Sequence, residues 1–165
     1  MDAIDRVLAQ WQSERPQLDT LPMGIMGRMM RLIKYLEAAV GELHKQHGLK
    51  MGEFDVLATL LRAGAPHQLT PSELLASMML TSGAMTNRLD KLEQKGLITR
   101  VHSTADRRSI EVKLSEQGLD LINTLLEEHV NIQHQLMATL TTEQQQALTA
   151  LLRDWLGSFE PAGGA

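Results

Sequence analysis

The sequence predicts a mainly α-helical protein with one small β-hairpin, and three observations lead to that fold class. Apolar residues recur at helical spacing over most of the 165 residues. Two short helical segments follow each other closely between Thr70 and Gly96, which is the sequence shape of a helix-turn-helix. Residues 97–114 then read as two short strands around a polar tip, a hairpin or wing. We therefore expect a winged helix-turn-helix flanked by dimerisation helices.

The N-terminal part of the chain predicts two helices. Residues 4–11 carry apolar side chains at helical spacing, and the pattern stops at Arg15, because proline at position 16 disfavours helix in its predecessor. Residues 17–22 are expected to form a linker. A long helix is predicted over residues 23–47, with Gly48 as its stop.

The middle of the chain carries the helix-turn-helix signal. A helix with apolar residues over 54–61 comes first. Thr70 can cap the next helix, Pro71 fits its first turn, and Glu73 completes a capping box. After a turn at residues 81–83, a second helix carries Met85, Leu89 and Leu92 and closes at Lys95 and Gly96. We expect this second helix to be the one that would enter a DNA groove.

The hairpin and two more helices complete the predicted architecture. The strands are expected over 97–102 and 110–114, with a charged tip between them. Ser115 can cap the helix that follows, and Thr141 with Gln144 forms the capping box of a last helix. The expected organisation is therefore N-terminal helices for dimerisation, a winged DNA-binding region, and C-terminal dimerisation helices, at residues 1–48, 49–114 and 115–165.

Composition excludes several classes of protein. The chain has no cysteine, so disulfide frameworks, thiolate metal sites and cysteine catalysis are excluded. No stretch approaches the length of apolar sequence that a membrane span needs, and the start of the chain lacks the pattern of a signal peptide. We expect a soluble cytoplasmic protein without a membrane partner.

Charge is unevenly distributed along the sequence. The net charge is −4, yet residues 81–113 hold seven basic and four acidic side chains, a net +3, which leaves −7 for the rest. A basic fifth in an acidic protein is a possible phosphate-binding footprint. This distribution favours nucleic acid as a partner only in combination with the helix-turn-helix pattern.

The helical wheel of the second helix predicts the DNA-contacting residues. With Met85, Leu89 and Leu92 facing inward, the opposite face can present base-reading and phosphate-binding groups. The arginines at the hairpin tip could enter a minor groove beside the same helix. The alternative is an ordinary solvated helix face. The predicted DNA-binding residues are Ser82, Thr86, Asn87, Lys91, Arg107 and Arg108.

Residues 69–118 resemble the winged-helix core of the MarR family of regulators. The resemblance rests on the segments 70–74, 81–89, 92–100, 106–109 and 114–118, and the flanking helices extend it over nearly the whole chain. It implies a homodimer built from the terminal helices that binds a pseudo-palindromic operator in double-stranded DNA and usually represses.

A finer resemblance concerns the extra N-terminal helix with Trp11. It is similar to that of the PecS-like branch of the family, which responds to urate through a tryptophan, an aspartate and two arginines. The residues at the matching places are Trp11, Asp55, Arg88 and Arg100. A flat aromatic anion stacked on Trp11 would compete with Asp55 for the arginines. The alternative is that Trp11 is a packing anchor, Asp55 a solvated or capping residue, and the arginines phosphate contacts.

Parts of the sequence also fit other classes of function. Glu42, His44 and His47, with His129 and His134, suggest a metal sensor, although exposed helix histidines explain the same pattern. No HExxH, phosphate-binding glycine loop or GxSxG occurs, so we expect no catalytic residues, no cofactor and no enzyme. An oligomerisation module that senses a ligand or metal without strong DNA specificity is the alternative function.

Overall fold

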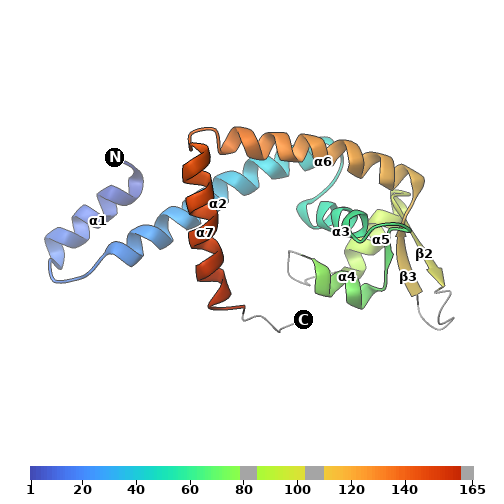
Figure 1. The fold of residues 1–165 in the computed structure, drawn as a ribbon, viewed down its shortest axis with the longest axis horizontal. Helices are drawn as coiled ribbons and strands as arrows, with labels where there is room; N and C mark the ends of the chain where they lie inside the picture. Colours follow the sequence, from blue (N-terminus) through green and yellow to red (C-terminus); the bar gives the residue numbers. More distant parts are fainter. Residues whose placement is uncertain (79–84, 103–109, 161–165) are drawn as a thin grey trace. The chain divides into compact units, whose positions relative to one another are not determined.

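The computed structural model describes residues 1–78, 85–102 and 110–160, and it divides into two compact units. The first unit is Met1–Gly41 and the second is Glu42–Ala165. The helices are α1 (Ala3–Glu14), α2 (Leu21–Gln46), α3 (Met51–Arg62), α4 (Pro71–Ser77), α5 (Met85–Gln94), α6 (Glu116–Leu136) and α7 (Thr142–Gly157), and the strands are β1 (Gln68–Leu69), β2 (Ile98–His102) and β3 (Ile110–Leu114) (Figure 1).

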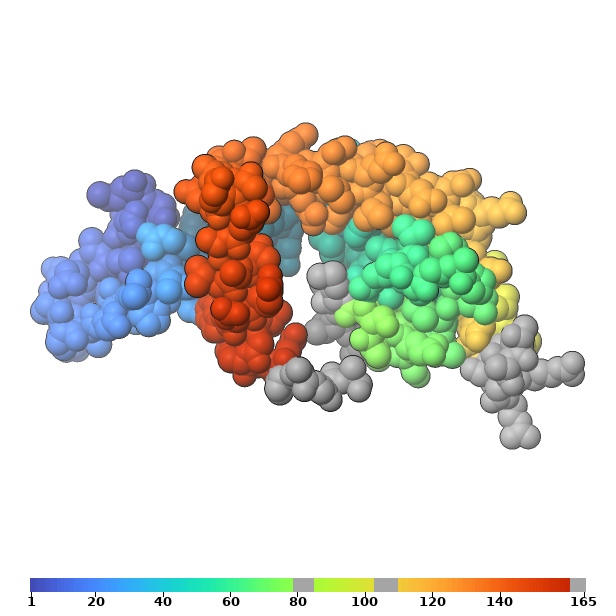
Figure 2. All heavy atoms as spheres, in the orientation of Figure 1, coloured from blue at the N-terminus to red at the C-terminus, as the bar shows by residue number. Residues whose placement is uncertain are grey.

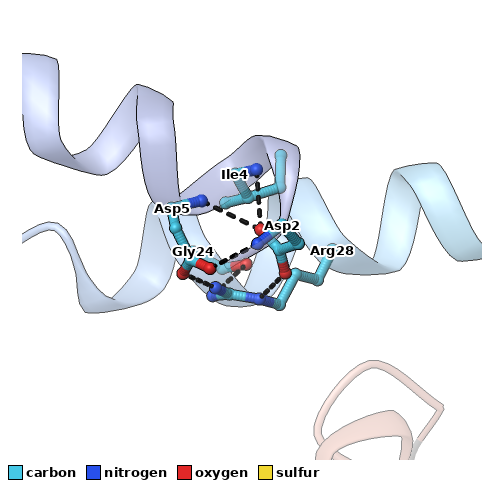
Figure 3. Close-up of polar contacts among 5 residues, drawn as sticks. All are labelled: Asp2, Ile4, Asp5, Gly24 and Arg28. Atoms are coloured by element: carbon cyan, nitrogen blue, oxygen red, sulfur yellow. Dashed lines mark hydrogen bonds and ion pairs between the residues drawn. The ribbon is translucent and has the colours of Figure 1, made fainter.

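The first unit is a helical hairpin of α1 and the main part of α2. Asp2 caps α1, because its side chain accepts hydrogen bonds from the N–H groups of Ile4 and Asp5. Arg28 of α2 donates to the carboxylates of Asp2, at 2.8 Å, and of Asp5 (Figure 3). These contacts place the first turn of α1 against α2.

The predicted linker over residues 17–22 is wrong at its end. Leu21 begins α2, and Pro22 therefore lies inside the first turn of that helix. Proline is tolerated there, because the N–H that it lacks would have no partner within the helix. The N–H of Leu21 donates instead to Asp19 Oδ1 at 3.0 Å.

The second unit is built around one apolar core. Fully buried side chains come from α3, α4, α5, β2, β3 and α6, and they include Leu57, Leu60, Leu74, Leu92, Ile98, Val112, Ile122 and Leu125. Atoms of α6 lie directly over those of α3 (Figure 2). The core therefore joins the helix-turn-helix, the sheet and α6 into a single body.

The sheet has three antiparallel strands in the order β1-β3-β2. In the predicted hairpin, Ile98 pairs with Leu114, and His102 pairs with Ile110. The two-residue strand β1 was not predicted, and it pairs with β3 through Gln68 and Leu69. A strand of two residues has no periodicity of its own, so only the pairing with β3 reveals it. The tip of the hairpin lies outside the described residues.

Helices α1 and α7 each bury none of their residues. Helix α7 presents a row of exposed apolar side chains, Leu148, Leu151, Leu152, Trp155 and Leu156. Across the described parts of the chain, no helix is long and apolar enough to cross a membrane.

Candidate nucleic-acid interface and effector residues

The start of the helix-turn-helix is held by a side-chain cap. Thr70 Oγ1 accepts from the N–H of Glu73 at 3.3 Å, and Glu73 accepts from the N–H of Thr70 at 2.8 Å, which is the predicted capping box. The hydrogen bond from the Thr70 N–H and a second one from the Thr70 hydroxyl to the Glu73 carboxylate hold the pKa of Glu73 below its usual value. Helix α4 therefore begins where the local sequence places it.

Helix α5 is anchored through one face and exposed on the other. Leu89 and Leu92 are buried in the core, whereas Thr86 and Asn87 are exposed and Lys91 is half-buried. Gly96, with φ +71°, ends the helix and lets Leu97 donate to the Leu92 carbonyl at 3.0 Å. The N-terminal half of α5 thus presents an amide and a hydroxyl to solvent, the groups that can read base edges. Of the other predicted DNA-binding residues, Ser82, Arg107 and Arg108 lie outside the described residues.

Lys95 ties the end of α5 to the start of α3. Its ammonium lies 2.8 Å from Glu53 Oε2 and 2.8 Å from the carbonyl oxygen of Gly48. Glu53 is 2% exposed. Burial raises the pKa of its carboxyl group, but hydrogen bonds from Lys95 and the Lys50 N–H outweigh burial and leave that pKa lowered. The buried carboxylate is thus charged and paired, which connects the two helices.

Arg100 on β2 is bound to α5. Its guanidinium lies 2.5 Å from Asp90 Oδ1 and 3.2 Å from Glu93 Oε2. The hydrogen bond to Asp90 is the main cause that raises the Arg100 pKa. A helical wheel puts Asp90 on the face of α5 opposite Met85, Leu89 and Leu92, where it would be solvated. In the structure, Asp90 binds Arg100 of the strand that leads into the wing. Arg100 therefore links the wing strand to the recognition helix.

Arg88 lies against α3, at the position of Gly52. A Cβ added at Gly52 would meet Arg88 Nε at 2.5 Å and Cζ at 2.7 Å. Asp55, three residues further along α3 and 8% exposed, shares that face of the helix. The structure thus brings the Arg88 guanidinium to the side of α3 that Asp55 occupies, while Arg100 has carboxylate partners on α5. Trp11 belongs to the first unit, where it is 40% exposed.

The alternative of exposed helix histidines is wrong for His44, which belongs to a stacked ring cluster that sequence reasoning did not predict. His44 is fully buried, with its ring centroid 4.0 Å from that of Phe54, and its Nε2 lies 3.1 Å from His129 Nδ1. His47 instead lies 3.0 Å from Glu128. His44, Phe54 and His129 come from α2, α3 and α6, so only the tertiary structure brings their rings together. Within the described residues no group of three or more histidines and carboxylates could hold a metal ion.

Comparison with known proteins identifies the family to which this chain is similar. The model of the MarR family matches residues 49–110. The chain is 36% identical over 149 residues to the HTH-type transcriptional regulator PecS of Dickeya dadantii (strain 3937), covering 90% of this chain and 90% of that protein. The matching family and this relative are transcription regulators, which confirms that the chain is not an enzyme.

Two solved structures share the fold. Sco3205, a MarR family transcriptional regulator from Streptomyces coelicolor in complex with DNA, has a TM-score of 0.77 at 20% identity, with coverage of 88% of this chain and 91% of that chain. The organohalide-sensing regulator RdhR-CbdbA1625 in its 2,4-dichlorophenol-bound form has a TM-score of 0.76 at 22% identity, with coverage of 90% and 86%. These neighbours confirm the fold class, mainly helical with a small sheet in a winged helix.

Proposed function

The chain belongs to the MarR family of transcription regulators, and from this premise we propose that it is a homodimeric repressor that leaves its operator when a small aromatic anion such as urate binds. It is a DNA-binding regulator, and the proposal concerns the operator, the dimer and the effector. The observation that carries the proposal is the anchoring of α5, which buries Leu89 and Leu92 while Thr86 and Asn87 stay exposed. That geometry leaves the first turns of a firmly held helix free to enter a major groove.

The exposed apolar face of α7 supports the homodimer. Trp155 and four leucines of that helix stay exposed, and an apolar face of this kind is typical of a surface that another chain covers. A second copy supplies a matching face, and a two-fold dimer fits a pseudo-palindromic operator, because each half-site then meets one winged helix-turn-helix.

The position of the Arg88 side chain supports the proposal of an anionic effector. The Arg88 guanidinium lies on the side of α3 that Asp55 occupies, so an incoming anion would compete with Asp55 for the arginine. The relative PecS is 36% identical to this chain, and the fold neighbour RdhR-CbdbA1625 binds 2,4-dichlorophenol, a small aromatic molecule. We therefore propose that the effector binds the Arg88 guanidinium in competition with Asp55. Trp11 and Arg100 stay predicted effector residues, and the Trp11 indole would stack on the aromatic ring.

Replacing Asn87 with alanine is expected to lower DNA specificity. A lost bidentate contact to a base costs about 1–3 kcal/mol on the operator and little on random DNA. The measurement is a titration of the protein against a duplex that it selects from a random-sequence pool and against a scrambled duplex of the same length. Gln94→Ala, at the exposed far end of α5, is the matched control and should leave the ratio of affinities unchanged. Equal losses on both duplexes would contradict a base-reading role for Asn87.

Replacing Asp55 with asparagine is expected to blunt the response to the effector. The amide has the shape of the carboxylate but not its charge, so the competition with the anion disappears. In the unmodified protein, coupling of 1–3 kcal/mol would weaken operator binding by about 5–150-fold at saturating urate. In Asp55→Asn the change should fall below about twofold. Glu127→Gln, on the exposed surface of α6, should respond as the unmodified protein does.

Fluorescence gives a second readout of the same prediction. Urate should quench Trp11, and Trp11→Phe isolates the background emission of Trp155. Aromatic acids, phenols and purines are screened in parallel, so that a different effector is recognised. If none of these compounds quenches Trp11 or releases DNA, the proposal of an aromatic effector is contradicted. That result would leave the DNA-binding function intact.

A further inference from the structure

Gly52 occupies an unusual place for a helical residue. It lies in the first turn of α3, where glycine is a poor helix former. An added Cβ would meet Arg88 Nε at 2.5 Å, Cζ at 2.7 Å and Cδ at 3.1 Å, and Cβ atoms do not approach heavy atoms closer than 3.0 Å. The guanidinium of Arg88 therefore lies on the bare backbone of α3, in space that any side chain at position 52 would fill.

Nearby charges also bear on the placement of the Arg88 guanidinium beside the first turn of α3. The N-terminal turn of a helix carries partial positive charge, so a cation beside it is disfavoured unless nearby carboxylates offset that charge. Glu53 of the same turn is engaged by Lys95 at 2.8 Å. Asp55 supplies a further carboxylate, on the face that Gly52 shares. Carboxylates on this face thus offset the partial positive charge of the helix terminus beside the guanidinium.

The position of Arg88 along α5 means that its contact with α3 affects how α5 is oriented. Arg88 directly precedes the buried Leu89, and Asn87, on its other side, is exposed. A contact that fixes the Arg88 side chain against α3 therefore fixes the rotation of α5 about its own axis. The rotation decides where Thr86 and Asn87 point.

We propose that Gly52 is a positioning residue for DNA recognition, because its missing side chain provides the seat on which Arg88 holds helix α5 against α3. The inference rests on the DNA-reading role of α5 and not on the effector. Failure of the effector experiments therefore leaves it untouched, whereas failure of the Asn87 experiment removes the role that the seat serves.

The test is a double-mutant cycle of Gly52→Ala and Arg88→Ala. The added methyl group displaces a guanidinium at the end of a flexible side chain, so Gly52→Ala should fold. Its affinity for the selected operator duplex should fall about tenfold, and its affinity for the scrambled duplex much less. In the Arg88→Ala background the same change should alter operator affinity less than twofold, because no guanidinium remains to be displaced. Gly41→Ala is the matched control, since nothing lies within 4 Å of an added Cβ there.

Thermal melting provides a readout that needs no DNA. Alanine is the better helix former, so Gly52→Ala should raise Tm in the Arg88→Ala background and lower it, or leave it unchanged, when Arg88 is present. Operator binding by Gly52→Ala equal to that of the unmodified protein would overturn the proposal. Equal effects of Gly52→Ala in both backgrounds, on affinity and on Tm, would overturn it as well.

Discussion

Replacing Gly118 with alanine is expected to destabilise the protein by about 3 kcal/mol, at the upper end of the cost of overpacking. Gly118 is buried in the first turn of α6, where its N–H donates to Ser115 Oγ at 2.9 Å. An added Cβ would lie well inside contact distance of the Leu97 carbonyl oxygen and 2.9 Å from the Leu97 carbonyl carbon. Neither group can rotate away, since both belong to the backbone.

The clash falls on the junction between α6 and the turn after α5. The Ser115 N–H donates to the Leu97 carbonyl at 3.1 Å, and Ser115 Oγ donates to the Gly96 carbonyl at 2.6 Å. Moving α6 away to make room would break these contacts and open the core around Ile122. DNA binding should therefore decline together with stability.

The measurements for Gly118→Ala are urea unfolding and thermal melting, both followed by circular dichroism, and Tm is expected to fall by roughly 10 °C. Gly157→Ala, at the end of α7, is the matched control, because an added Cβ there meets nothing within 4 Å. Its stability should stay within about 0.5 kcal/mol of the unmodified protein. A Gly118→Ala variant as stable as this control would show that α6 does not begin against Leu97.

Acidification is expected to remove about 3 kcal/mol of stability through His44 between pH 6.5 and pH 4. Burial in the stack with Phe54 and His129 lowers the pKa of His44 to about 4, and positive charge on His129 and His47 lowers it further in the same direction. Burial also lowers the pKa of His129. In the unfolded chain, a histidine takes up its proton near pH 6.5.

The sign of the pH effect follows from this lowered pKa. Between pH 6.5 and pH 4 the unfolded chain binds a proton at His44 that the folded chain does not bind, so acid favours unfolding. The contribution is fully present above pH 6.5 and is lost as the pH falls through that window. Because the stack joins α2, α3 and α6, protonation should loosen α6 from the DNA-binding body.

The pH prediction is tested by urea unfolding at steps between pH 7 and pH 4. His44→Phe keeps a flat ring in the stack and cannot be protonated, so its stability should fall less over this range. Subtracting the two curves removes the carboxylates, which titrate in both proteins. His134→Gln, at an exposed position of α6, should keep the full pH dependence. Parallel curves for His44→Phe and the unmodified protein would contradict the burial of His44.

Much of the secondary structure could be predicted from the sequence, because helix caps and turns are local. Thr70, Ser115 and Thr141 each accept from a backbone N–H three residues later, as their spacing predicts. The hairpin register follows from alternation on one buried face. The helical wheel supplied candidate DNA-binding residues, and the family resemblance added the candidate effector residues, which composition and periodicity alone do not identify. The predicted end of the linker before α2 was wrong, because a proline in the first turn of a helix and a proline just before a helix give the same sequence pattern.

Only the tertiary structure decided which distant groups meet. His44 and His129 are 85 residues apart, and no local pattern places their rings in one stack. Nothing in the sequence distinguishes Gly52 and Gly118 from other helix residues. In the structure, Arg88 lies against Gly52 and the Leu97 carbonyl lies against Gly118. Asp90 looked solvated on the helical wheel, and the approach of β2 pairs it with Arg100. Local sequence determined the elements because caps and periodicity act within a few residues, whereas close packing of those elements determined which residues position the recognition helix.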